Sequence, residues 1–183
     1  MLKFFLSFAL ISLLALSLGS AQLHAEMKDK AHQIKHFARV DLNLYRGGQP
    51  TRADLIALKE LGVKKIINFR NEEKLIEEER ALVEELGLEY VSIPWLIFAP
   101  YDHTVFTRFF AEIKDKDSAP VFFHCKRGSE RTGAAAAIYK ITHKGFSVEN
   151  AFSDACRFNV LFYWKPFVKN IITEYHTLTH EKP

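Results

Sequence analysis

The chain alternates short apolar runs with longer stretches in which apolar residues recur every three or four positions. Four short runs are typical of strands, at residues 41–46, 63–69, 88–93 and 120–124. The longer spacing, with capping residues and glycines at its ends, predicts helices at residues 51–61, 72–86, 102–114, 131–143, 147–157 and 161–178. Strands that alternate with helices predict an α/β domain, in which a mostly parallel sheet of four or five strands carries helices on both faces.

The first residues follow a different pattern. One positive charge at Lys3 precedes an apolar run at residues 4–18, and small residues follow that run. This order is typical of a secretory signal peptide, and cleavage is expected after Ala21, with Ala25 as the alternative. The run is shorter than the roughly 20 residues that span a bilayer, which favours cleavage over a membrane anchor. We therefore expect a signal peptide at 1–21, a flexible arm at 22–38 and one folded domain at 39–183, located in the periplasm or secreted.

Composition adds two limits to this picture. The formal net charge of +3, or +2 once Lys3 is removed, predicts no nucleic-acid partner. The 16 phenylalanines indicate an apolar interior rather than disorder. After cleavage, no stable membrane span is expected.

The richest chemistry lies in residues 124–132. Cys125 directly follows an apolar strand, and Arg131 lies six positions later, just before a helical run of small residues. A loop between a strand and a helix directs backbone N–H groups and the positive end of the helix dipole at one point, which stabilises a thiolate or a bound anion. The planar fork of Arg131 matches two phosphoryl oxygens. The pattern predicts a hydrolase of phosphate esters.

With His124 before the cysteine and Thr132 after the arginine, this segment resembles the Cys-x5-Arg-Thr loop of the protein-tyrosine-phosphatase superfamily, and in particular its small atypical dual-specificity members. Residues 44–50 and 66–72 resemble two strands of bacterial, plant and fungal members, so the resemblance covers about residues 40–175. It implies a phosphotyrosine-protein-phosphatase-like fold with no metal or cofactor. Residues 39–183 would form the catalytic domain.

The site residues follow from the loop chemistry together with this resemblance. Cys125 is expected to attack phosphorus and form a cysteinyl-phosphate, while Arg131 holds the phosphoryl oxygens. Thr132, and less firmly Ser129, are candidates to donate a hydrogen bond to the sulfur of Cys125. His124 is expected to orient the loop and to point away from it. The residues assigned to substrate binding are Lys126, Arg127, Gly128, Ser129 and Glu130.

The general acid is the least defined assignment. Family members of this type carry an aspartate on a loop about thirty residues before the nucleophile, whereas residues 93–98 here contain no carboxylate. Asp102 lies later on the same connection and is our catalytic candidate, although an N-cap of the next helix is the competing role. Glu130 is the rival, and a substrate with a good leaving group would need neither.

The expected substrate is a phosphorylated small molecule or a phosphoprotein. The basic pair Lys126 and Arg127 favours polyphosphorylated inositols over phosphoproteins, unless these side chains face solvent or pair with Glu130. Arg46, Arg70 and Lys165 are candidates for a basic rim. Trp95, Phe98 and Tyr101 either line the mouth of the site or belong to the core.

Two other classes of function stay open from the residues alone. One is a rhodanese-like sulfurtransferase, although its loop lacks the counterpart of Arg131. The other is a phosphate-binding module without catalysis. Cys156 follows a helical pattern and is expected to be a buried thiol, and the superfamily resemblance offers it the alternative role of protecting an oxidised Cys125.

Overall fold

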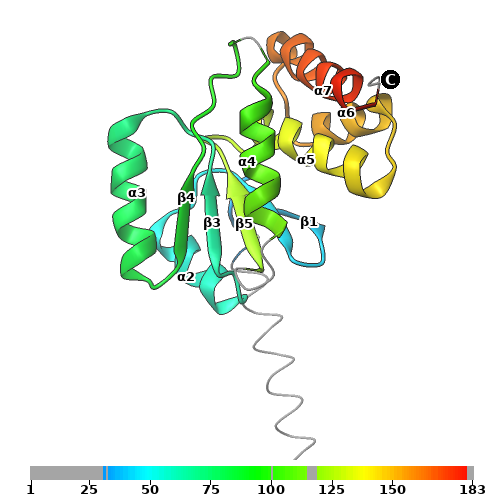
Figure 1. Ribbon diagram of the computed structural model, residues 1–183. Coiled ribbons are helices and arrows are strands. Elements are labelled where there is room, and N and C mark those ends of the chain that lie inside the picture. The colour runs from blue at the N-terminus through cyan, green and yellow to red at the C-terminus, as the bar shows by residue number, and fades with distance from the viewer. Residues whose placement is uncertain (1–30, 32, 100, 115–118, 181–183) are drawn as a thin grey trace, which may run out of the picture.

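The computed structural model describes residues 31, 33–99, 101–114 and 119–180, and the signal peptide expected at 1–21 lies outside this part. A single sheet of five strands has the order β1-β2-β5-β3-β4 (Figure 1). Its strands are β1 (Ala38–Asp41), β2 (Leu44–Gly47), β3 (Lys65–Asn68), β4 (Glu89–Ser92) and β5 (Val121–His124). Only the β1–β2 pair is antiparallel, so the predicted mostly parallel α/β sheet is confirmed.

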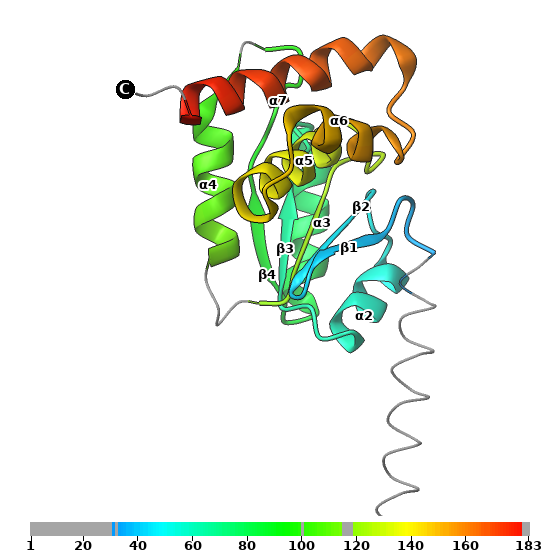
Figure 2. The ribbon, with the colours of Figure 1, turned by 90° about the vertical axis from the view of Figure 1, so that its right-hand side faces the viewer.

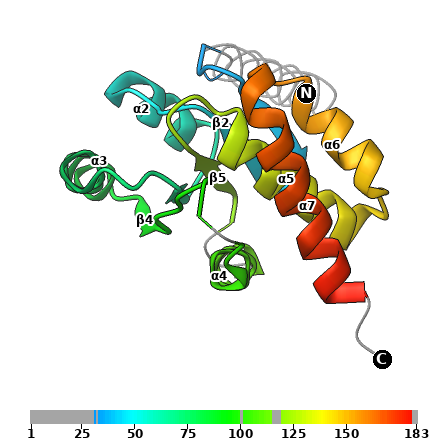
Figure 3. The ribbon, with the colours of Figure 1, turned by 90° about the horizontal axis from the view of Figure 1, so that it is seen from above.

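Helices cover both faces of this sheet (Figure 3). They are α2 (Arg52–Glu60), α3 (Glu73–Glu85), α4 (His103–Lys114), α5 (Glu130–Lys144), α6 (Val148–Cys156), the 3-10 helix η1 (Phe162–Trp164) and α7 (Lys165–His180). One core cluster joins α2 and α3 to Ile66 and Phe122. The other cluster contains residues of α4, α5, α6 and α7 (Figure 2), packed with Ile67 and Phe123. These two are the neighbours of Ile66 and Phe122 along β3 and β5. The alternation of side chains along a strand therefore divides the interior into two layers.

Local sequence signals explain most of the element boundaries. Thr51 accepts a hydrogen bond from the backbone N–H of Asp54, whose side chain accepts one from the Thr51 N–H, so the capping box predicted for α2 is confirmed. The strand predicted at 41–46 is instead a hairpin. Asp41 pairs with Leu44 across a tight turn at residues 42 and 43, which leaves Leu42 strongly exposed.

The prediction of a flexible arm at 22–38 is wrong for the last residues of that range. Ile34 is buried, and Phe37 stacks on Tyr45 and on Phe122, with ring centroids 5.8 and 6.3 Å apart. This segment lies against the sheet because β2 and β5 present the rings of Tyr45 and Phe122 there. Over the described residues, no helix is both long and apolar enough to cross a bilayer.

Candidate active site

Cys125 directly follows β5, the central strand of the sheet. It is a free thiol, 2% exposed, and it belongs to the core cluster beneath α5. Residues 126–129 then form a short loop, and α5 begins at Glu130. The predicted order of strand, loop and helix is therefore present, and the amino end of α5 lies beside the thiol.

A pocket of about 260 Å³ opens above this loop. Five of its lining residues come from the loop and from the first turn of α5, namely Cys125, Lys126, Arg127, Glu130 and Arg131. The others come from the connections after β3 and β4 and from η1, and they are Asn71, Trp95, Leu96, Ile97, Phe98 and Trp164. The wall opposite the basic loop is thus apolar and aromatic.

Arg131 is held in place by backbone from two other strands. Its Nη1 donates hydrogen bonds to the carbonyl of Phe69 at 2.9 Å, to Oδ1 of Asn71 at 3.1 Å and to the carbonyl of Trp95 at 3.3 Å. Phe69 and Asn71 follow β3, and Trp95 follows β4. The guanidinium is therefore oriented beside Cys125 before any ligand binds, which reduces the reorganisation needed to stabilise a charged transition state.

The loop is also supported from behind by Arg46, at the end of β2. This side chain is 1% exposed, its Nη2 donates to the carbonyl of Gly128, and its guanidinium lies 3.8 Å from the centre of the Phe158 ring. Burial lowers the pKa of Arg46 to about 10, while Cys125 and Asp154 oppose that shift, so the group stays charged at neutral pH. A buried cation thus lies directly beneath the cysteine loop.

His36, from the segment before β1, holds the same loop. Its Nδ1 lies 2.8 Å from the carbonyl oxygen of Arg127 and 3.1 Å from Oγ of Ser129. Burial lowers the pKa of His36, which favours the neutral ring in this position.

Gly128 packs against the glycine pair that ends β2. Its φ of +74° is in the left-handed region, and a Cβ placed there would lie 2.5 Å from backbone atoms of Gly47 and Gly48. Only glycine satisfies both conditions at this position. The sequence pattern that ends β2 with two glycines therefore serves the loop as well as the strand.

On the other face of the sheet, a buried polar network centres on Glu79 of α3. Its carboxylate lies 3.0 Å from Nε2 of His124 and accepts hydrogen bonds from Asn68, Tyr90 and Gln49. Burial alone would raise the pKa of Glu79, but His124 and these hydrogen bonds outweigh burial and hold the pKa below its usual range. His124 is buried on this face and does not line the pocket, as the sequence predicted.

The structure gives several residues of the loop other partners than predicted. Gly128 and Ser129, assigned to substrate binding, are buried and are not among the lining residues, so that role stays a prediction for their backbone N–H groups. The hydroxyl of Thr132 donates to the carbonyl of Gly47 at 3.5 Å, and that of Ser129 lies against His36, so both have partners other than the predicted sulfur. Arg127 pairs with Glu130, which was one of the alternatives left open.

The structure places the two acid candidates very differently. Asp102 is exposed and caps α4, because its Oδ1 accepts hydrogen bonds from Oγ1 of Thr104 at 2.7 Å and from the Thr104 N–H at 2.9 Å. These bonds lower the pKa of Asp102, and the residue does not line the pocket. Glu130 supplies the one carboxylate among the lining residues, and it also accepts the N–H of Leu161 at 3.4 Å. The catalytic assignment of Asp102 is therefore replaced by a helix cap.

Sequence reasoning missed Asn71 and Trp164, and it misplaced two arginines. Asn71 is signalled only by its position directly after the β3 region, and η1 has no distinct pattern. Arg46 and Arg70 do not form a rim, since both are buried and Arg70 pairs with Glu72 at 2.8 Å. Within the described ranges, no group of three or more His, Cys, Asp or Glu side chains is placed to hold a metal ion.

Comparison with known proteins gives a consistent group of relatives. A family model described as "DSP-PTPase phosphatase fused to NAD+ Kinase" matches residues 22–160. The dual specificity protein phosphatase TpbA of Pseudomonas aeruginosa is 28% identical over 119 residues, which make up 65% of this chain and 52% of TpbA. The chain thus spans about half the length of the curated relatives that it matches.

Two solved structures share the fold. The crystal structure of a putative phosphatase from Shewanella putrefaciens has a TM-score of 0.69 at 23% identity, over 82% of this chain and 97% of that one. The core catalytic domain of the PP-IP phosphatase Siw14 from S. cerevisiae, solved with citrate, has a TM-score of 0.61 at 17% identity, over 80% and 94% of the two chains.

Proposed function

Because this chain belongs to the DSP-PTPase phosphatase family, within the atypical dual-specificity branch of the protein-tyrosine-phosphatase superfamily, we propose that it is a cysteine-dependent phosphatase. The observation that carries the proposal is the pocket that Cys125 and Arg131 line together, with Arg131 fixed by the backbone of Phe69 and Trp95. A nucleophile and an oriented cation lie where a phosphoryl group fits.

The reaction has two steps. The sulfur anion of Cys125 attacks phosphorus, an S–P bond forms, and the P–O bond to the leaving group breaks. The leaving oxygen keeps the electron pair and takes a proton from water or from Glu130. A water molecule then attacks phosphorus, the S–P bond breaks, the thiolate is regenerated, and inorganic phosphate leaves. Arg131 and the amides at the start of α5 stabilise the charge on the phosphoryl oxygens in both steps.

The substrate class that the pocket favours is a phosphorylated small molecule bearing more than one anionic group. Lys126 and Arg131 line one side, and Glu130, the single lining carboxylate, is already paired with Arg127. Basic side chains on this side of the pocket suit a substrate that carries several negative charges. The relatives span both classes, since Siw14 is described as a PP-IP phosphatase and TpbA as a dual specificity protein phosphatase.

We also propose that the protein acts outside the cytoplasm, in the periplasm or after secretion. The apolar run at residues 4–18, which follows Lys3 and precedes small residues, supports this location. Detection of a chain beginning near residue 22 in a periplasmic or culture fraction tests it.

The activity is tested with three substrates and one variant. The purified chain is expected to hydrolyse p-nitrophenyl phosphate, and phytate faster than a phosphotyrosyl peptide. Cys125→Ser removes the nucleophile while keeping the pocket, so turnover is expected to fall by about a thousandfold or more with phosphate-ester binding retained. If Cys125→Ser bound the esters and matched the wild type in residual hydrolysis, the chain would be a binding module instead.

A further inference from the structure

One wall of the pocket continues outward as an exposed aromatic surface. Phe98 is 63% exposed, and Phe162 and Tyr163 are 86% and 62% exposed. Leu96 and Phe167 are exposed beside them, and we call these five residues the aromatic ridge. Apolar side chains that gather in this way on a soluble protein mark a surface that binds something, because water contact disfavours them.

Two segments far apart in sequence build the ridge. The ring of Phe98, after β4, lies 4.3 Å from the ring of Trp164 in η1 and 6.0 Å from that of Phe167 at the start of α7. The buried face of α7 carries Val168 and Ile172, so Phe167 is not needed for that packing. The ridge is therefore a structure assembled by the fold, distinct from the core beneath it.

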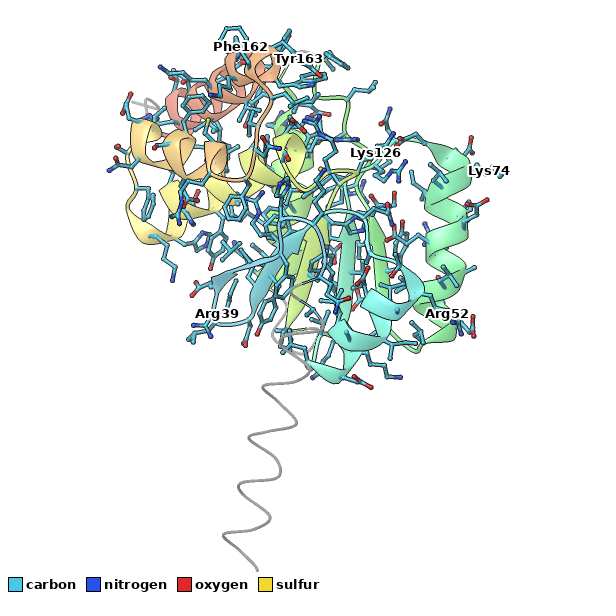
Figure 4. All side chains as sticks on the ribbon, turned by 180° about the vertical axis from the view of Figure 1, so that it is seen from behind. Arg39, Arg52, Lys74, Lys126, Phe162 and Tyr163 are labelled. Atoms are coloured by element: carbon cyan, nitrogen blue, oxygen red, sulfur yellow. The ribbon has the colours of Figure 1, made fainter. Side chains whose placement is uncertain are left out.

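The ridge is continuous with the proposed catalytic pocket. Leu96, Phe98 and Trp164 line the same pocket as Cys125 and Arg131. Figure 4 shows Phe162 and Tyr163 at the top of the molecule, Lys126, which also lines the pocket, in the same upper half, and Arg39 and Arg52 lower down. A surface that contacts the ridge would thus also lie near the pocket.

The charges around the ridge identify the kind of surface. Lys165 is exposed at the start of α7, directly after Trp164, and Lys126 is exposed on the other side of the pocket. Residues 95–99 and 161–170 contain no Asp or Glu. Aromatic side chains flanked by lysines are the composition that favours the interface of an anionic bilayer, where rings enter the headgroup region and ammonium groups meet lipid phosphates.

We propose that the aromatic ridge docks the protein on an anionic lipid bilayer and that its substrate is the terminal phosphate of a lipid headgroup presented there. This inference rests on the proposed phosphatase function and narrows its substrate to a phosphate monoester at a membrane surface, where neighbouring anionic headgroups supply the additional negative charge. Phe162, Tyr163 and Phe98 enter the interface, Lys126 and Lys165 contact anionic headgroups, and the pocket beside the ridge receives the phosphate. The chemistry at Cys125 is the same as for a soluble ester.

The experiment separates docking from catalysis. The chain without residues 1–21, which would bind lipid on their own, is floated with vesicles of phosphatidylcholine containing phosphatidylglycerol and phosphatidic acid. The double variant Phe162→Ser/Tyr163→Ser removes two rings that do not line the pocket. We expect its partition onto these vesicles to fall by about tenfold or more, and its hydrolysis of phosphatidic acid to fall in parallel. Its hydrolysis of p-nitrophenyl phosphate is expected to match the wild type.

Leu42→Ser is the matched control. Leu42 is also an exposed apolar side chain, but it lies in the β1–β2 turn, at the amino end of the parallel strands and away from the pocket. It is expected to bind vesicles as the wild type does.

Three results would overturn docking on lipid. The first is that the wild type does not bind vesicles, and the second is that the double variant binds them equally well. The third is that the wild type is a dimer and the double variant a monomer, with neither protein binding vesicles. If the wild type did not hydrolyse p-nitrophenyl phosphate, the phosphatase function would be rejected instead. The flotation experiment would still show whether the aromatic ridge binds lipid.

Discussion

The way Arg131 is held gives its side chain two separate tasks. In the part of the chain that the structure describes, protein acceptors contact Nη1, from Phe69, Asn71 and Trp95. Nε and Nη2 are the pair of donors that a phosphoryl group can use. One nitrogen therefore fixes the orientation of the plane while the other two serve the ligand, a division that a lysine ammonium cannot reproduce.

Two single-residue substitutions identify the general acid. Asp102→Asn is expected to leave both the pH–rate profile and the thermal stability almost unchanged, because asparagine also caps a helix and the residue lies outside the pocket. Glu130→Gln is expected to lower turnover of an alkyl phosphate by about a hundredfold and that of p-nitrophenyl phosphate only slightly. Steady-state kinetics from pH 4 to pH 9 measure both. A changed profile in Asp102→Asn alone would return the acid role to Asp102.

At the scale of elements, the cysteine loop and the end of β2 behave as one unit. Gly128→Ala is expected to lower turnover by at least about tenfold and to destabilise the fold by about 2 kcal/mol, because its Cβ would overlap the backbone of Gly47 and Gly48. Gly145→Ala has a similar φ of +68° and open space around it, so its cost is limited to backbone strain of about 1 kcal/mol with activity retained. Equal effects of the two substitutions on activity would contradict this coupling.

The polar network that joins α3 to the ends of β3, β4 and β5 predicts a pH dependence of stability. The folded state holds the pKa of Glu79 below its ordinary value of 4.5. Its stabilisation is therefore fully present above 4.5 and is lost below it, as the pH falls through the lower pKa of the folded state. We expect Glu79→Gln to lower the free energy of unfolding by about 2 kcal/mol at pH 7.

Urea unfolding at several pH values measures this difference. The gap between wild type and Glu79→Gln is expected to shrink as the pH falls below about 4.5. A gap that is constant from pH 7 to pH 3 would show that the Glu79 charge contributes nothing to the network.

At the scale of the whole molecule, the residues beyond the predicted domain boundary contribute to both fold and site. A chain that begins at residue 39 lacks Ile34, His36 and Phe37. Compared with a chain that begins at residue 22, we expect it to lose about 3 kcal/mol of stability, from the apolar burial removed, and most of its turnover. His36→Ala in the longer chain should reduce turnover while keeping most of the stability. Calorimetry measures the effect on stability, and steady-state kinetics measures the effect on turnover. Full activity of the shorter chain would contradict a role for His36.

Much of this architecture follows from local signals in the sequence. The hydrophobic periodicity locates the strands and helices, and the Cys125 to Arg131 spacing brings the two groups to one loop. The contacts that sequence could not supply are those between distant segments, such as His36 with Arg127, Arg46 beneath Gly128, and Phe98 against Trp164. No periodicity marks them, because each depends on where tertiary packing brings a side chain that local pattern leaves unassigned. The hairpin at residues 38–47 was missed because the pairing of Asp41 with Leu44 places a tight turn inside the apolar alternation of residues 41–46.

The burial of Cys125 also determines which alkylating reagents can reach its thiol. A thiol that is 2% exposed in a pocket lined on one side by Lys126, Arg127 and Arg131 favours small anionic alkylating reagents over bulky neutral ones. Cys156 is only partly buried, but burial raises the pKa of its thiol and slows its reaction. Iodoacetate should therefore label one cysteine selectively, and protection from it by inorganic phosphate would give a direct count of occupied sites.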